Sequence, residues 1–258
     1  MQFPWMTFNT GAGEQQVEEG FPRAPRGRCG SKKNCKFSYH MGGFAPGGQI
    51  LEETTEEKDV GIIISNTLKP SAHCAKAAKK ANQVLGQMSR GLHFRDKHTW
   101  IRLYCQYCRP HLDYCAQAYS PWTVADTELL ESVQERAVRM VSGLKEKSYG
   151  ERLKEVGLTS LVERRVRGDQ IQVWKTLHQK DDVNPETWFS YANHRPVGPP
   201  TRHTSDPWNL ANLPYNSEIR KNFWSVRCID TWNSLPTNLK SADTLASFKS
   251  NYDSLLLT

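Results

Sequence analysis

Four potential metal ligands lie close together in the middle of the chain. Cys105, Cys108, His111 and Cys115 form the spacing C-x2-C-x2-H-x3-C. Thiolate and imidazole groups are the ligands that Zn²⁺ prefers in tetrahedral structural sites. The same cysteines fall on a segment expected to be helical, where cysteine packs as a small hydrophobic side chain. We adopt this second interpretation and predict no metal site, with zinc as the alternative.

Positive charge is concentrated in the segment from Lys69 to Arg109. It holds nine Lys and Arg residues against one acid, Asp96, while the formal net charge of the whole chain is +7. A basic segment of this kind favours a polyanionic partner, above all nucleic acid. Lys76 and Lys80 are one helical turn apart, about 6 Å of rise, close to the spacing of successive phosphates along a strand. The alternative is a solvated lysine face of a helix.

Two shorter motifs are weighed against ordinary structural roles. The pair Asp181-Asp182 is the one Asp-Asp in the chain, and it stands where a helix gives way to a proline-rich loop. We therefore interpret it as a solvated turn. Arg167-Gly168-Asp169 spells an adhesion tripeptide, but it falls inside an expected helix, where Asp169 can pair with Arg165 at i,i+4. No phosphate-binding loop, dinucleotide fingerprint, HExxH or nucleophile elbow is present, so no cofactor is predicted.

Composition indicates a folded protein rather than a disordered chain. The 258 residues are 38% hydrophobic and include eight Trp, nine Phe and nine Tyr, enough for a core. No apolar run approaches the roughly 20 residues that span a bilayer, and the first 30 residues lack the apolar stretch of a secretory signal. Seven cysteines, an odd number, fit reduced thiols. We expect an intracellular protein, nuclear or cytoplasmic, without membrane contact.

Helical signals are clearest between Thr127 and Asp169. Apolar residues recur at helical spacing in the first part, at Leu130, Val133, Ala137, Met140, Val141 and Leu144, and Gly143 stands near the end of that helix. The opposite face carries Glu128, Glu131, Gln134, Glu135 and Arg139. Two Ser-x-x-Glu capping boxes follow. Ser148 opens a short helix that stops at Gly157, and Ser160 opens another that runs to about His178.

The preceding residues are expected to form strands and two helices. Phe37–His40 and Gln49–Leu51 read as a hairpin with a Gly-rich loop, and Asp59–Ser65 as a third strand buried on both faces. A helix from about Ser71 to Gly91 should bury Cys74, Ala77, Ala78, Ala81, Leu85 and Met88. Another is expected over Asp96–Arg109, ended by Pro110.

The C-terminal third changes character. Gln179–Leu213 is rich in proline and poor in periodic apolar residues, which is typical of a linker. Two final helices are expected, over Ile219–Leu235 and Ser241–Leu257, separated by Pro236. Apolar residues at helical spacing should dock the first of them onto the preceding bundle: Phe223, Val226, Ile229 and Trp232.

Several blocks of this sequence resemble one family. LLESVQERAVRMVSGL followed by SYGERLKEVGLTSLVERRVRGD is similar to the region after the polymerase core in reverse transcriptases of non-LTR retrotransposons, in particular the chicken-repeat and jockey-like LINE elements. EEKDVGIIISNTLKPSAHCAKAAKKANQVLGQMSR resembles their last palm strand and first thumb helix. RPHLDYCAQAYSP and RKNFWSVRCIDTWNSLPTNLKSADTLASFKSNYD resemble later blocks. The resemblance covers roughly Ser38 to Asp253.

The resemblance implies a nucleic-acid grip without catalysis. A polymerase thumb holds the template–primer duplex, so Lys76, Lys79, Lys80, Arg90 and Arg102 are predicted to contact RNA or an RNA–DNA hybrid. The palm's aromatic-x-Asp-Asp turn, which would hold two Mg²⁺ ions, has no counterpart here, so we predict no polymerase activity for this chain alone. The alternative is a helical protein-interaction or scaffold module, or an expressed relic of a retrotransposon.

The predicted fold is therefore mainly α. It consists of a thumb-like helical bundle with a small N-terminal β-hairpin or three-stranded sheet. In chain order the expected parts are a disordered tail (1–34), a palm-remnant hairpin or sheet (35–68), a helical thumb-like domain (69–178), a proline-rich linker (179–213) and C-terminal helices (214–258).

Overall fold

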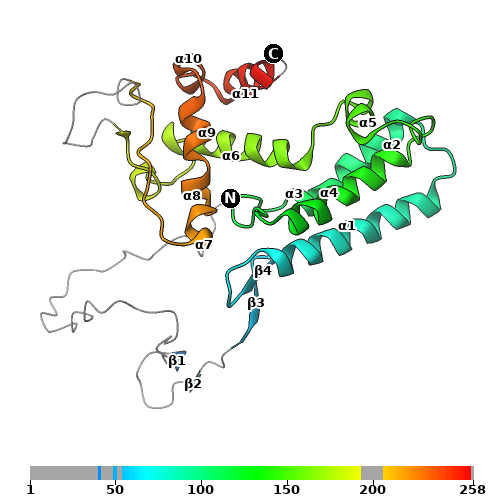
Figure 1. Ribbon diagram of the computed structural model, residues 1–258, viewed down its shortest axis with the longest axis horizontal. Helices are drawn as coiled ribbons and strands as arrows, with labels where there is room; N and C mark the ends of the chain where they lie inside the picture. Colours follow the sequence, from blue (N-terminus) through cyan, green and yellow to red (C-terminus); the bar gives the residue numbers. More distant parts are fainter. Residues whose placement is uncertain (1–39, 42–48, 51–53, 193–205, 257–258) are drawn as a thin grey trace, which may run out of the picture. The chain divides into compact units, whose positions relative to one another are not determined.

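The protein is mainly helical, as predicted, with strands confined to short hairpins (Figure 1). A computed structural model describes residues 40–41, 49–50, 54–192 and 206–256. The chain divides into two compact units, Met1–Thr54 and Thr55–Thr258. In the first, β1 (His40–Met41) pairs antiparallel with β2 (Gln49–Ile50), which confirms the expected hairpin. The expected tail (1–34) and the start of the first strand (37–39) lie outside the described residues.

The predicted third strand is instead a hairpin of its own. β3 (Glu56–Asp59) pairs antiparallel with β4 (Ile62–Ser65). Val60 and Gly61, between them, both have positive φ, 46° and 85°, as a two-residue hairpin turn requires. The strands in the described residues thus form two separate two-stranded sheets, so both the continuous strand and the three-stranded sheet were wrong. The run of β-branched residues concealed the turn, and of β4 only Ile62 is buried.

The first hydrophobic core lies between two long helices that run side by side (Figure 1). They are α1 (Ser71–Gly91) and α4 (Val124–Arg139). α1 buries the face that the sequence predicts, including Cys74, Ala77, Ala78, Ala81 and Leu85. Most of these side chains are small, which allows a close approach of the packed helices.

Three consecutive helical segments complete the first core. α2 (Lys97–Leu103) leads without a break into the π-helical η2 (Tyr104–Cys108), which continues as α3 (Arg109–Asp113). Pro110 therefore does not end the helix, contrary to the prediction. The wide π turn offers the physical reason, because it re-registers the backbone hydrogen bonds just before a residue that has no N–H to donate.

Both predicted capping boxes are present. α5 (Tyr149–Val156) starts at Ser148 and α6 (Leu161–Leu177) starts at Ser160, and in each case the serine and the glutamate three residues on cap one another. Gly157 ends α5 in a left-handed conformation, with φ of 70°. Such termini are encoded locally, which explains why they could be predicted.

The polar face predicted for α4 is partly internal. Gln134 is 1% exposed, and its side-chain oxygen accepts a hydrogen bond of 3.0 Å from the Tyr104 hydroxyl. The carboxylate of Glu131 accepts the backbone N–H of Leu161 at 3.0 Å, which satisfies one of the free donors at the start of α6. These two residues connect helices rather than facing solvent.

A second core joins α6 to the C-terminal segments. α7 (Glu218–Lys221), α8 (Trp224–Arg227) and α9 (Ile229–Ser234) replace the first predicted C-terminal helix, and α10 (Thr237–Lys240) precedes α11 (Leu245–Leu256). Val226 is nonetheless buried, and Ile229 and Trp232 pack with Val173 and Trp174 of α6, much as expected.

The described part of the expected linker belongs to this second core. Phe189 is 3% exposed and Leu210 is 2% exposed. Tyr191 and Leu210 form an isolated antiparallel bridge, and a short 3₁₀ turn, η3 (Pro185–Thr187), precedes it. Residues 179–192 and 206–213 are irregular in conformation, as predicted, but they are packed.

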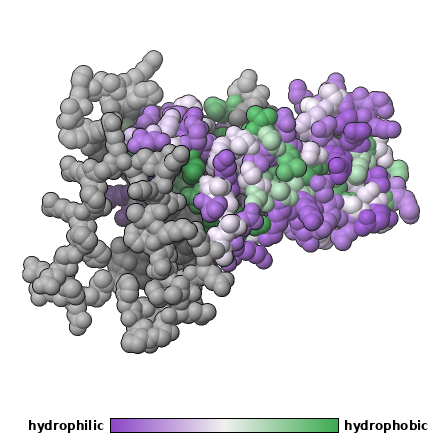
Figure 2. All heavy atoms as spheres, turned by 60° about the horizontal axis from the view of Figure 1, so that its bottom comes forward, coloured by the Kyte–Doolittle hydropathy of each residue, from purple (hydrophilic) through white to green (hydrophobic). Residues whose placement is uncertain are grey.

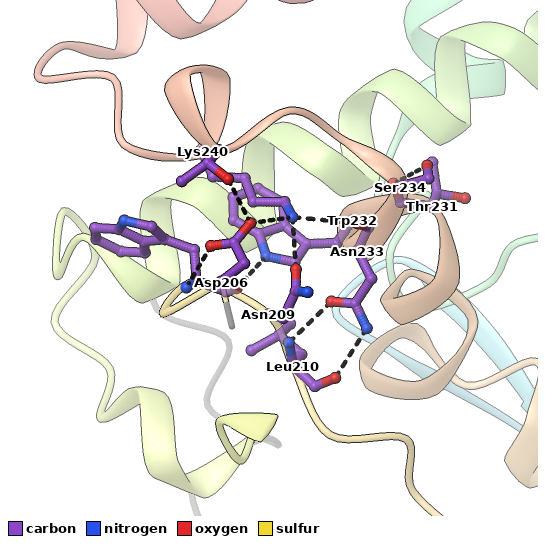
Figure 3. Close-up of polar contacts among 10 residues, drawn as sticks. Asp206, Asn209, Leu210, Thr231, Trp232, Asn233, Ser234 and Lys240 are labelled. Carbon is purple, nitrogen blue, oxygen red and sulfur yellow. Dashed lines mark hydrogen bonds and ion pairs between the residues drawn. The ribbon is translucent and has the colours of Figure 1, made fainter. Parts of the chain in front are cut away.

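A buried lysine organises the polar side of the second core (Figure 3). The Nζ of Lys240 is 3.0 Å from Asp206 Oδ2, donates to Asn209 Oδ1 at 2.6 Å and reaches the Asn233 carbonyl at 3.2 Å. Lys240 is 1% exposed. Burial alone would raise the pKa of Asp206, but hydrogen bonds from Trp208 N–H and from Lys240 outweigh it and hold this pKa below its usual value.

Removing the acidic partner of this lysine should destabilise the fold. Asp206→Ala leaves the Lys240 ammonium buried without its counter-charge, and we expect a loss of about 3 kcal/mol in the free energy of unfolding. Chemical denaturation measures it. Asp243→Ala, at an exposed acid, is the control and should change stability by less than about 0.5 kcal/mol. Equal effects of the two variants would contradict the role given to the Lys240–Asp206 pair.

Candidate nucleic-acid interface

Four of the five predicted cations share one face of α1. At about 100° per residue, Lys76, Lys79, Lys80 and Arg90 fall within an arc of roughly 100°. All four are exposed, as is Arg102 on α2. None of the five side chains forms an ion pair or a hydrogen bond with another residue in the described part of the chain. Their charge is therefore available to an external anion.

Neighbouring cations of the same basic segment are engaged in contacts with other residues of the chain. Lys97 lies 3.4 Å from Glu155, and Arg109 lies 3.8 Å from Asp113. Arg95 donates to the Ser89 carbonyl at 3.0 Å and stacks over the Trp100 ring. This division separates structural cations from free ones, which the sequence could not do.

The structure adds one arginine of α4, Arg136, to this basic surface. Arg136 donates to Asn82 Oδ1 of α1 at 3.0 Å, so its guanidinium lies beside the α1 helix. Arg139, one turn further along α4, is exposed. Its expected partner Glu135 is instead 3.9 Å from Arg152. Only the side-by-side packing of α1 and α4 makes Arg136 part of the surface, so the sequence alone offered no signal for it.

Exposed aromatic side chains lie in the same region of the sequence. Phe94, four residues after Arg90, is 75% exposed, and Tyr107 is 58% exposed. Exposed aromatic rings next to cations are typical of surfaces on which bases stack. In the view of Figure 2, hydrophilic residues cover much of the described surface, with smaller hydrophobic areas between them.

His73 couples the β-hairpin to the basic helix. Its Nδ1 accepts the backbone N–H of Ile63 at 3.2 Å, and its ring packs edge-on against Tyr119. Burial, with a smaller effect from the charge of Lys76, lowers the pKa of His73 to about 4. The ring is therefore neutral at pH 7, as its role as acceptor requires.

The four candidate zinc ligands do not converge. Cys108 is buried, and its thiol donates to the Ala81 carbonyl at 3.3 Å. Burial raises the pKa of Cys105 and Cys115, and that of Cys108 to about 12. Within the described ranges, no group of three or more His, Cys, Asp or Glu side chains is placed to hold a metal ion. Cys108 packs as the small hydrophobic residue that the sequence suggested.

The acidic residues of the two short motifs, Asp181-Asp182 and Arg167-Gly168-Asp169, are explained by their positions in the fold. Asp181 follows α6 and accepts a hydrogen bond from Gln172, whereas Asp182 is exposed. Asp169 is buried in α6 and pairs with Arg227 at 2.9 Å rather than with Arg165 as expected. A helical, buried aspartate cannot be presented to an adhesion receptor.

In the part of the chain that the structure describes, no helix is long and apolar enough to cross a bilayer.

The buried histidine leads to a pH prediction. A folded pKa of about 4, below the ordinary 6.5, means that the stability from neutral His73 is present above about pH 6.5 and is lost as the pH falls toward 4. Linkage gives a free energy of unfolding about 1 to 2 kcal/mol lower at pH 5 than at pH 7. An NMR titration of the ring gives the pKa directly.

A matched pair of variants isolates the effect of Lys76 on this histidine. Lys76→Ala should raise the pKa of His73, because it removes the neighbouring positive charge, whereas Lys79→Ala should leave it nearly unchanged. A His73 that titrates near 6.5 in the unmodified protein would contradict the buried, neutral ring.

Chelation tests the interpretation of the cysteines. Because the thiols do not gather around a common point, EDTA should leave the unfolding temperature of the protein unchanged, and the purified chain should carry no stoichiometric zinc. Elemental analysis and thermal unfolding with and without EDTA measure both. A fall in the unfolding temperature that added Zn²⁺ reverses would show that the alternative was right.

Comparisons with known proteins give no match. No protein-family model matches this chain, and neither a curated protein nor a solved structure matches it. The resemblance to non-LTR reverse transcriptases thus rests on the sequence blocks quoted above and stays an expectation. The geometry of the basic surface is the basis for a functional conclusion.

Proposed function

We propose that this chain is a reverse transcriptase-like fragment that lacks the catalytic palm and binds RNA or an RNA–DNA hybrid. The binding residues are Lys76, Lys79, Lys80, Arg90 and Arg102. One observation carries the proposal: these cations are exposed, and no described residue neutralises them. The sequence resemblance to a polymerase thumb supports the same partner. The proposal implies an intracellular location, nuclear or cytoplasmic.

The dimensions of α1 suit a nucleic-acid backbone. From Lys76 to Arg90 the helix rises about 21 Å, so its basic face extends past several consecutive phosphates. Contacts of this kind release counterions and depend little on base sequence. Because the free cations are lysines and arginines on a rigid helix, binding should be salt-sensitive and sequence-tolerant.

Polymerisation is not part of the proposed function. The aromatic-x-Asp-Asp motif of the family is missing from the sequence, and the one Asp-Asp pair, Asp181-Asp182, follows the end of α6. A primer-extension assay with Mg²⁺ is expected to give no product. DNA synthesis by the purified chain alone would overturn this part of the proposal.

Binding is tested by titrating labelled single-stranded RNA and an RNA–DNA hybrid with the protein at several salt concentrations. Five contacts predict a slope of log K against log salt of about −3.5 for a single strand and about −4.5 for a duplex. Lys76→Ala/Lys80→Ala removes two contacts, so the slope should become less negative by about 1.4 to 1.8. At 0.1 M salt its affinity should be weaker by roughly 25- to 60-fold.

A control variant separates this surface from general positive charge. Lys154→Ala/Lys180→Ala removes two other exposed lysines and the same total charge. If it weakens RNA binding as much as Lys76→Ala/Lys80→Ala does, the basic face of α1 is not the site. No binding even at low salt would instead favour the alternative, a helical scaffold module.

A further inference from the structure

A cavity lies between α6 and the C-terminal helices, and none of the α1 residues discussed above lines it. The cavity, of about 200 Å³, is lined by residues of α6, α8 and α9 together with the segment that leads into α4. A water molecule takes up about 30 Å³, so the cavity can hold a small molecule or a few waters. Both charged and neutral polar side chains line it.

The charges in the cavity wall do not balance. Arg165, Asp169 and Arg227 all line it, two cations against one anion. Asp169 is committed to Arg227, which contacts both carboxylate oxygens at 2.9 and 3.0 Å. Arg227 also donates to the carbonyls of Asn222 and Ala116. Arg165 is left without an acid at ion-pair distance among the described residues.

Arg165 is also short of hydrogen-bond acceptors. It is 5% exposed, and its one hydrogen bond runs from Nη2 to the Leu112 carbonyl at 3.1 Å. Its Nε and Nη1 are buried without a partner. A buried guanidinium with unused donors is unfavourable unless something supplies acceptors and negative charge. Among the described residues the Leu112 carbonyl is the one acceptor for Arg165, and Asp169, the nearest acid, is ion-paired with Arg227.

The remaining lining residues indicate the class of ligand. Ser120 and Thr231 also line the cavity, and a hydroxyl group can donate to an oxyanion. Gln170 donates its Nε2 to the Cys228 carbonyl, while its Oε1 is buried and without a partner. An anion that accepts from Arg165 and also carries an O–H would satisfy both. Hydrogen phosphate has this combination, whereas acetate and chloride lack the donor.

We propose that this cavity binds a small oxyanion of the hydrogen-phosphate class, held by Arg165 and by the hydroxyls of Ser120 and Thr231. The ion pair between Asp169 and Arg227 forms the rigid wall of the site. The site is independent of RNA binding by α1, because none of the proposed RNA contacts lines it.

The test measures binding of inorganic phosphate to the full chain at pH 7 and constant ionic strength. Isothermal calorimetry gives the dissociation constant, and thermal unfolding gives the stabilisation that a ligand specific for the folded state must produce. Phosphate is expected to bind saturably with one site and to raise the unfolding temperature. Acetate should bind at least tenfold more weakly, and chloride should have no saturable effect.

Two variants locate the site. Arg165→Met should abolish the response to phosphate while the chain stays folded, because a hydrophobic side chain of similar length removes an unpaired buried charge. Thr231→Val leaves the charges intact and should weaken phosphate binding by roughly three- to tenfold. The Lys76→Ala/Lys80→Ala variant should bind phosphate in the cavity as the unmodified chain does.

Three results would overturn the proposal. The first is a phosphate response that persists in Arg165→Met, which would indicate a general salt effect or the α1 face. The second is the absence of saturable binding, which would leave only water in the cavity. The third is acetate binding as tightly as phosphate, which would exclude the assigned ligand class. Loss of RNA binding alone would not affect this site.

Discussion

The structure depends on a single helix, α6, whose two ends are buried in two different hydrophobic cores. Leu161, its first residue, belongs to the core formed by α1 and α4, while Val173 and Trp174 belong to the core formed with the C-terminal segments. Its start is held by the Glu131 carboxylate from α4. Any shift of α6 along its axis would therefore disturb both cores, because closely packed interiors do not deform continuously.

Buried charges mark the contacts that hold the C-terminal segments in place. Asp169 of α6 pairs with Arg227 of α8, and Lys240 of α10 pairs with Asp206. A buried charge is unfavourable unless its partner is correctly placed, so each pair specifies one arrangement of elements that are too short to be stable alone. The α8, α9 and α10 helices have four to six residues each. They are positioned by these contacts and by the packing of Trp224 and Trp232 in the second core.

The same reasoning separates cations that are engaged in contacts within the chain from cations that are exposed and unpaired. A local surplus of positive charge in a sequence includes side chains such as Arg95, which is engaged with Ser89 and Trp100, and Lys97, which faces Glu155. Other cations face outward without an ion-pair partner among the described residues, and four of them, Lys76, Lys79, Lys80 and Arg90, share one face of α1. Net charge in the sequence predicts a polyanionic partner, and the structure shows which of the cations have no ion-pair partner among the described residues. Arg165 is the converse case, a cation that is internal and still uncompensated.

Local signals in the sequence determined where the long helices lie. The apolar spacing of α1 and the capping boxes of α5 and α6 act within one or two turns, so they can be recognised without knowledge of any neighbour. Contacts between distant segments decided the rest: the π turn before Pro110, the packed rather than linking role of Phe189, the burial of Gln134 and the pairing of Asp169 with Arg227. Each of these features depends on which side chain of a distant segment packs against it, and the periodicity of residues along the chain does not contain that information.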